Sequence, residues 1–158
     1  MITFFEYNWQ VRDEWFEWSS NLTREYLVEK RVGGVESILY TLFHIVEVES
    51  SWIRGIQGKE EILIEFKHYN ELEKVKKLSD TYRKEIINFL KSSLYESSNA
   101  LITVPWDEDS YSKEDILHHI IAHEIHYIGQ LSIWAREIGL KPISTSFIER
   151  ERRGINHF

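Results

Sequence analysis

Apolar and polar residues alternate at helical spacing over four long stretches of the chain. Apolar residues recur at intervals of three and four within about residues 3–20, 35–56, 71–94 and 113–138, and charged residues fill most positions between them. Each stretch therefore predicts an amphipathic helix with one face for a shared core. Four such helices with little strand signal predict an all-α fold, a four-helix bundle.

Turn and capping residues mark the ends of these helices. Gly33-Gly34 separates the first two, and Gly139 follows the last. Ser112-Lys113-Glu114-Asp115 resembles a capping box that starts the fourth helix. Thr23 is expected to cap a short helical turn over residues 24–27.

Less regular stretches connect the helices. The connection at about residues 57–70 is long enough to permit a crossover between the second and third helices, and its apolar residues predict that it packs on the bundle. Residues 97–99 are expected to end the third helix, and the β-branched residues of 100–104 indicate a short extended piece. The tail, residues 143–158, is expected to form a short helix or an oligomer contact.

Composition narrows the class of protein. The chain has 158 residues, which predicts one domain spanning 1–158. It has no cysteine, and this excludes disulfides, thiolate zinc fingers and a cysteine nucleophile. The six Trp, eight Tyr and eight Phe predict many buried or pocket-lining rings, and together with the tail they suggest a homodimer.

The charge pattern disfavours a nucleic-acid or membrane partner. The formal net charge is -7, and Arg150, Arg152 and Arg153 are interleaved with Glu149 and Glu151. The N-terminus has no signal-peptide pattern, and no apolar run approaches the ~20 residues of a membrane span. We therefore expect a cytoplasmic protein.

Histidines are the main candidates for chemistry. His118, His119, His123 and His126 lie in the fourth predicted helix, and the last three are spaced so that they share one face. Apolar neighbours predict that this face partly meets the core, where imidazoles need partners. A divalent transition metal is one such partner.

His44, in the second predicted helix, is the natural complement to this row. A histidine alone on such a helix is more often a hydrogen-bonded core residue. Opposite the row on the fourth helix, however, it would complete a set of three ligands with positions left open, as in catalytic metal sites. His123 and His126 are three residues apart, so the stretch is not the His-Glu-x-x-His motif of zinc proteases.

With these motifs the chain resembles the DinB-like (damage-inducible protein B) family of bacterial four-helix bundles. The resemblance rests on His44 in Leu-Phe-His-Ile, on Glu49 and Trp52, and on the run from His123 to Gln130, His-Glu-Ile-His-Tyr-Ile-Gly-Gln. Relatives include bacillithiol S-transferases and mycothiol-dependent maleylpyruvate isomerase. The resemblance implies a Zn or Ni site made by one histidine of the second helix and two of the fourth.

The identity of the third ligand stays open. The family commonly reads His-x-x-His-His-Arg-Gly-Gln and places its second ligand of the fourth helix four residues after the first, where this chain has Tyr127. We take His44, His123 and His126 as the predicted metal ligands. His119 and a Tyr127 phenolate are the alternatives, and a weakened or lost site is a further one.

Three functions follow from these expectations. The first is a metal-dependent, bacillithiol-type S-transferase that joins a low-molecular-weight thiol to a small electrophile, as the resemblance implies. The second is a non-catalytic metal-binding or stress-related bundle. The third is a purely structural bundle whose histidines only make hydrogen bonds.

The remaining polar and aromatic residues receive structural interpretations. Glu47, Glu49 and Glu124 are expected to be solvated or salt-bridged, unless one of them orients a ligand histidine. Gly129 is expected to allow close helix packing. His118 is expected on another face of the helix from His123, which disfavours a role as ligand. Surface positions are expected for His68 and His157, and core or interface positions for Trp9, Trp15, Trp18, Trp52, Trp106 and Trp134.

Overall fold

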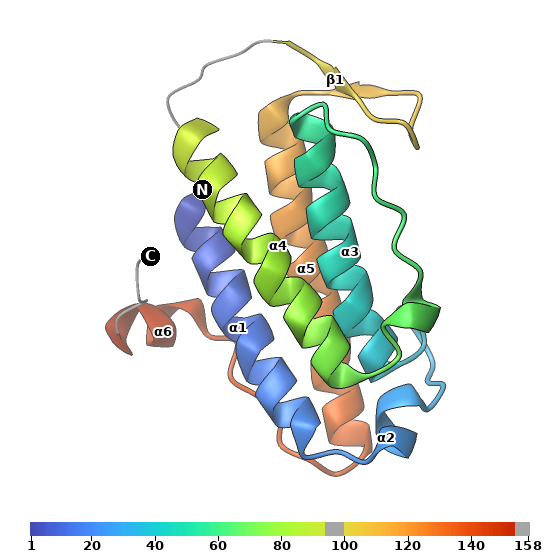
Figure 1. Cartoon of the computed structure of the whole chain (residues 1–158). Helices are drawn as coiled ribbons and strands as arrows, with labels where there is room; N and C mark the ends of the chain where they lie inside the picture. The colour runs from blue at the N-terminus through green and yellow to red at the C-terminus, as the bar shows by residue number, and fades with distance from the viewer. Residues whose placement is uncertain (94–99, 154–158) are drawn as a thin grey trace.

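Four long helices lie side by side and form the molecule (Figure 1). The computed structural model describes residues 1–93 and 100–153. The long helices are α1 (Ile2–Ser20), α3 (Ile38–Ile56), α4 (Leu72–Ser93) and α5 (Lys113–Glu137). The predicted all-α bundle is confirmed.

The connection between α3 and α4 crosses the length of the bundle. In Figure 1 this segment descends beside α3, so that α4 starts at the lower end and rises in the same direction as α3. Its Phe66 lies in η1 (Phe66–His68), with ring centroids 4.7 Å from Tyr40 and 5.3 Å from Phe43 on α3. The crossover that the length of this connection permits is thus present, and the predicted packing of the connection on the bundle is confirmed.

Local backbone chemistry decides where the helices begin. α3 starts later than its periodicity indicates, because Gly33, Gly34 and Glu36 have positive φ angles of 90°, 52° and 71°. Ser37 then caps it by accepting a hydrogen bond of 3.2 Å from the Tyr40 amide.

The predicted caps have different outcomes. Ser112 accepts a hydrogen bond of 3.0 Å from the Asp115 amide at the start of α5, so this capping prediction is confirmed. α2 (Arg24–Val28) does follow Thr23, but the Thr23 side chain accepts no capping hydrogen bond. Thr23 is the N-cap residue of α2, as predicted, but it caps by position and not through its side chain.

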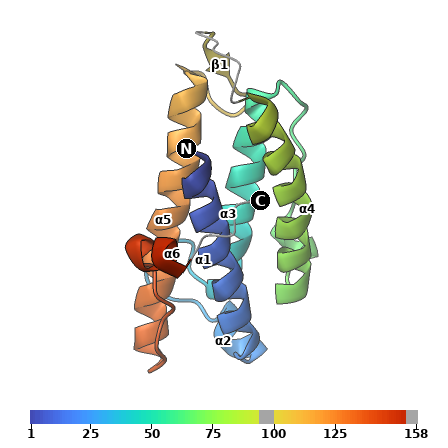
Figure 2. The same ribbon diagram turned by 90° about the vertical axis from the view of Figure 1, so that its left-hand side faces the viewer.

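A short hairpin and a terminal helix lie at the edges of the bundle (Figures 1 and 2). β1 (Ile102–Thr103) pairs antiparallel with β2 (Ser110–Tyr111), and only the first of these was expected. The tail forms α6 (Phe147–Arg153), whose Phe147 ring stacks on Phe4 at 5.2 Å. The expected helix end at 97–99 and the surface position of His157 lie outside the described residues.

The core is rich in aromatic side chains from all four long helices. Trp9, Trp15 and Trp134 are at most 2% exposed, as predicted. Trp106 was expected in the core or at an interface. It is 39% exposed, so a position in the core is wrong. Within residues 1–93 and 100–153, no helix has the length and apolar character to cross a membrane.

Candidate functional site

Three aromatic side chains from α3 and α5 meet at one place on the bundle. His44 lies on α3, and His123 and Tyr127 lie one turn apart on the facing side of α5. The ring centroid of His44 is 5.0 Å from those of both His123 and Tyr127, and the centroids of His123 and Tyr127 are 4.7 Å apart. The three rings thus form a nearly equilateral triangle, which we call the His–Tyr triangle.

The other two histidines of the row lie at the margins of this triangle. The His119 ring is exposed, 5.8 Å from His123, and its other neighbour is Trp52 at 5.3 Å. His126 is also exposed, and its ring stands perpendicular to Tyr127 at 5.1 Å. A spacing of three residues rotates His126 about 60° away from His123, toward solvent.

The side chains of the triangle are possible ligands of a metal ion. Among residues 1–93 and 100–153, no group of three His, Cys, Asp or Glu side chains is arranged to hold a metal ion. The triangle offers two imidazoles and one phenol, and these can act as nitrogen and oxygen ligands of a transition metal. The metal ligands expected from the sequence, His44, His123 and His126, stay a prediction.

Electrostatics keeps one corner of the triangle neutral. Burial, reinforced by the neighbouring His44, His119 and His126, lowers the pKa of His123 to about 4. At neutral pH His123 is therefore uncharged, which is the form that binds metals.

A carboxylate orients the histidine of α3. The Nδ1 atom of His44 lies 3.4 Å from a carboxylate oxygen of Glu47, one turn further along α3. This contact fits the expected role of an acidic residue beside a ligand histidine. The Nε2 atom of His44 then remains available to coordinate a metal ion.

The Gly33-Gly34 turn closes one side of the triangle. A Cβ atom on Gly34 would lie 3.1 Å from the Cγ of Gln130 and 3.7 Å from the Cε1 of Tyr127, and a Cβ on Gly33 only 2.8 Å from the Oε1 of Gln130. Both residues also have positive φ. Glycine is therefore required here by the left-handed backbone and by the close approach to α5.

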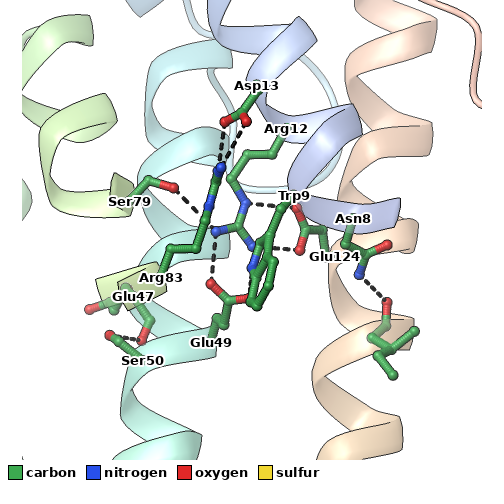
Figure 3. Close-up of polar contacts among 11 residues, drawn as sticks. Asn8, Trp9, Arg12, Asp13, Glu47, Glu49, Ser50, Ser79, Arg83 and Glu124 are labelled. Carbon is green, nitrogen blue, oxygen red and sulfur yellow. Dashed lines mark hydrogen bonds and ion pairs between the residues drawn. The ribbon is translucent and has the colours of Figure 1, made fainter. Parts of the chain in front are cut away.

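A buried ion cluster lies in the interior of the bundle, among side chains of the long helices (Figure 3). The Arg12 guanidinium of α1 donates from Nε and Nη2 to the Glu124 carboxylate, at 2.8 and 2.5 Å, and from Nη1 to Glu49 at 2.7 Å. Arg12 is 0% exposed, and the two glutamate side chains are each 2% exposed. Glu124 directly follows His123, so the cluster adjoins the site through the backbone of α5.

Two further side chains belong to the cluster, so that all four long helices contribute to it. The Trp9 indole of α1 donates to Glu49 at 2.8 Å, and Nη1 of Arg12 donates to Ser79 of α4 at 3.3 Å. Burial alone would lower the pKa of Arg12, but the carboxylates of Glu124 and Glu49 outweigh it and raise the pKa. Burial raises the pKa of the Glu124 carboxyl, and its ion pair with Arg12 opposes this rise.

The structure tests the interpretations of Glu49, Glu124 and Gly129. The expected salt bridges of Glu49 and Glu124 are confirmed, but sequence reasoning missed their partner, Arg12. The signal was an arginine one turn from the apolar Trp9 and Trp15. A Cβ atom added to Gly129 would meet no neighbouring atom within 4 Å, so the expectation that this glycine allows close packing within the chain is wrong.

The fold is an all-α helical bundle that brings His44, His123 and Tyr127 together, and comparisons with known proteins show the family to which it belongs. The DinB family model matches residues 1–154, so the chain belongs to the DinB family. It is also 57% identical over 159 residues to the "Uncharacterized protein YizA" of Bacillus subtilis (strain 168), with both chains covered completely. The name of that relative states no activity.

Proposed function

We propose that the protein binds a divalent transition metal, Zn or Ni, between α3 and α5, and that this site transfers a low-molecular-weight thiol to a small electrophile. The observation that carries the proposal is the His–Tyr triangle, whose ring centroids are all within 5.0 Å of one another. Family membership adds support, because related bundles use histidines at the corresponding places of these two helices.

The geometry supports Tyr127 as the third ligand more strongly than His126. Tyr127 lies close to both other corners, whereas the ring contact of His126 is with Tyr127 itself. Tyr127 also stands at the position where the family usually has its second histidine of this helix. His126, the ligand expected from the sequence, is exposed on the solvent side.

The residues of this chain would hold the site ready rather than supply the nucleophile. A bound divalent metal lowers the pKa of a thiol or water and so provides a nucleophile at neutral pH. Glu47 would orient His44, and burial would keep His123 neutral. The chain has no cysteine, so the attacking sulfur would come from the cosubstrate.

Metal analysis tests this proposal directly. Untagged protein, as purified and after incubation with Zn or Ni, is analysed by mass spectrometry beside five variants: His44→Ala, His123→Ala, Tyr127→Phe, His126→Ala and His119→Ala. We expect stoichiometric metal in the wild type, loss in the first three, and retention in the last two. Loss in His126→Ala with retention in Tyr127→Phe would restore His126 as the third ligand, and no metal under any condition would refute the site.

One observation favours a second candidate, a metal-binding bundle without catalysis. Tyrosine at the third corner departs from the three-histidine pattern of the family. An activity screen with bacillithiol and small electrophiles separates the two functions. Thiol consumption that disappears in His44→Ala supports the transferase, whereas metal binding without thiol consumption supports the second candidate.

A further inference from the structure

We propose that an aromatic surface beside the His–Tyr triangle binds an uncharged aromatic ring of the substrate. This aromatic surface consists of Trp52, Trp106, Tyr111 and His119, which come from α3, the hairpin region and α5. The inference deepens the proposed function and rests on it, because it specifies the electrophile that the site would receive.

Ring contacts hold the aromatic surface together and join it to the triangle. Trp52 is the centre, with ring centroids 5.4 Å from Trp106, 5.9 Å from Tyr111 and 5.3 Å from His119, all in edge-on geometry. His119 in turn lies 5.8 Å from His123. The aromatic surface thus continues through His119 to His123, one of the proposed metal ligands.

Contacts with α3 and hydrogen bonds of its own hold the hairpin segment that carries Trp106. A Cβ atom on Gly55 of α3 would lie 2.7 Å from the Cγ1 of Val104 and 3.5 Å from the Cη2 of Trp106, so glycine lets this segment rest directly on α3. Asp107 accepts hydrogen bonds from the Tyr111 hydroxyl at 2.8 Å and from the Asp109 amide at 3.0 Å. Preorganised rings lose little entropy when a ligand stacks on them.

The exposure of Trp106 is the feature that points to a ligand. Trp9, Trp15 and Trp134 are almost fully buried, but Trp106 remains 39% exposed although it packs against Trp52 and lies close to Gly55. An exposed indole with a flat, fixed face is a stacking platform for another π-system. The structure therefore favours a flat aromatic group over a branched aliphatic one.

Nearby charges select against anions. Asp107, Glu108 and Asp109 follow Trp106 directly, and backbone and side-chain hydrogen bonds lower the pKa of Asp107. Glu47 lies beside the triangle at His44. Carboxylates on both sides disfavour an aromatic ligand with a sulfonate or carboxylate near the stacking ring.

Fluorescent probes test the proposal on metal-free, full-length protein. N-phenyl-1-naphthylamine is a neutral aromatic probe, and 1-anilinonaphthalene-8-sulfonate is its anionic counterpart. We expect the neutral probe to bind saturably and Trp106→Ala to weaken it by about fivefold, as the loss of one aromatic pair implies. Trp106→Phe should restore most of the affinity, and the anionic probe should bind about fivefold more weakly than the neutral one.

Phe4→Ala is the matched control, because Phe4 is 45% exposed and stacks on Phe147 away from the site. It should leave the affinity of the neutral probe unchanged. Absence of saturable binding, equal binding by Trp106→Ala and wild type, or equal affinity for both probes would overturn the proposal. Because the protein is metal-free, these results do not depend on whether the His–Tyr triangle binds metal.

Discussion

Arg12 of α1 binds the carboxylate of Glu124, the residue that follows His123 on α5, through two parallel hydrogen bonds of 2.8 and 2.5 Å. A guanidinium and a carboxylate paired in this way fix distance and orientation together. Because Nη1 of the same guanidinium binds Glu49 on α3, Arg12 also sets the relation between the helices that carry His44 and His123. The site thus depends on a residue that touches none of its rings.

Removing one partner of the ion cluster should strongly destabilise the fold. Replacing Arg12 with Met leaves two carboxylates buried without their partner, and we expect Arg12→Met to lower the free energy of unfolding by about 3–5 kcal/mol. Urea unfolding followed by circular dichroism measures this loss. The triple variant Arg12→Met, Glu49→Leu, Glu124→Leu should recover most of it, because no buried charge then remains.

Arg83→Met provides the control for this prediction. Arg83 makes a bidentate pair with Asp13 at 2.6 and 2.7 Å, but the Asp13 side chain is 45% exposed. Its removal should cost about 1 kcal/mol or less, since solvent screens the pair. Equal losses in Arg12→Met and Arg83→Met would show that the buried cluster has no special role.

Stability of the metal-free protein should decrease as the pH is lowered, because of His123. Burial lowers the pKa of His123 to about 4, from an ordinary value of 6.5. Between these two pH values the unfolded state binds a proton that the folded state does not, so this stability is present above pH 6.5 and is lost as pH falls toward 4. We expect His123→Gln to flatten the curve of unfolding free energy between pH 5 and 7.

His118→Gln is the control for the pH experiment, since His118 is exposed on the same helix. This control should keep the slope of the wild type. The same slope in His123→Gln as in the wild type would assign the pH dependence to other groups.

The Gly33-Gly34 turn should matter for both stability and metal binding. Gly34→Ala places a Cβ in the left-handed region and 3.1 Å from Gln130, beside Tyr127. We expect a loss of about 1–2 kcal/mol from the backbone alone, and weaker Zn binding by titration calorimetry because Tyr127 or Gln130 has to move. Gly58→Ala has a similar φ of 62° with nothing within 4 Å, so it should lose stability without affecting Zn. Equal Zn affinity of Gly34→Ala and Gly58→Ala would show that the Gly33-Gly34 turn does not influence the metal site.

The homodimer expected from the sequence remains a prediction, and α5 offers a surface for it. Ile125 and Ile133 are 44% and 52% exposed on α5, and Gly129 lies between them with open space beside it. An antiparallel pair of α5 helices centred on Ile125 would also bring Glu114 of one copy near Arg136 of the other. We expect Ile133→Asp to produce a monomer of 19.0 kDa in light scattering.

Ile148→Asp controls for a general effect of added charge, because Ile148 is 68% exposed on α6 rather than α5. It should leave the oligomeric state unchanged. A wild type that is monomeric across concentrations would refute the dimer.

Local chemistry made much of the fold predictable. Helical periodicity located the four long helices, and Ser112 marked the start of α5 through a hydrogen bond to a residue three positions away. Where local signals were weaker, the predicted helix boundaries differ from the observed ones. The positive φ angles up to Glu36 make α3 begin later than predicted, and no helical pattern in the sequence reveals these angles. The pairing of β1 with β2 was missed because two-residue strands carry almost no periodic signal.

By itself, the sequence determined an all-α bundle and the face of α5 that carries His119 and His123. These features follow from residue spacing along single helices, which the geometry of the α-helix fixes. The pairing of that face with His44 was a hypothesis, drawn from the way bundles build metal sites and from the family resemblance. Only the tertiary structure decided that Tyr127 forms the third corner, that Trp106 is exposed, and that Arg12 joins Glu49 to Glu124. Such relations depend on how far one helix is rotated against its neighbours, and packing of the whole core sets that rotation.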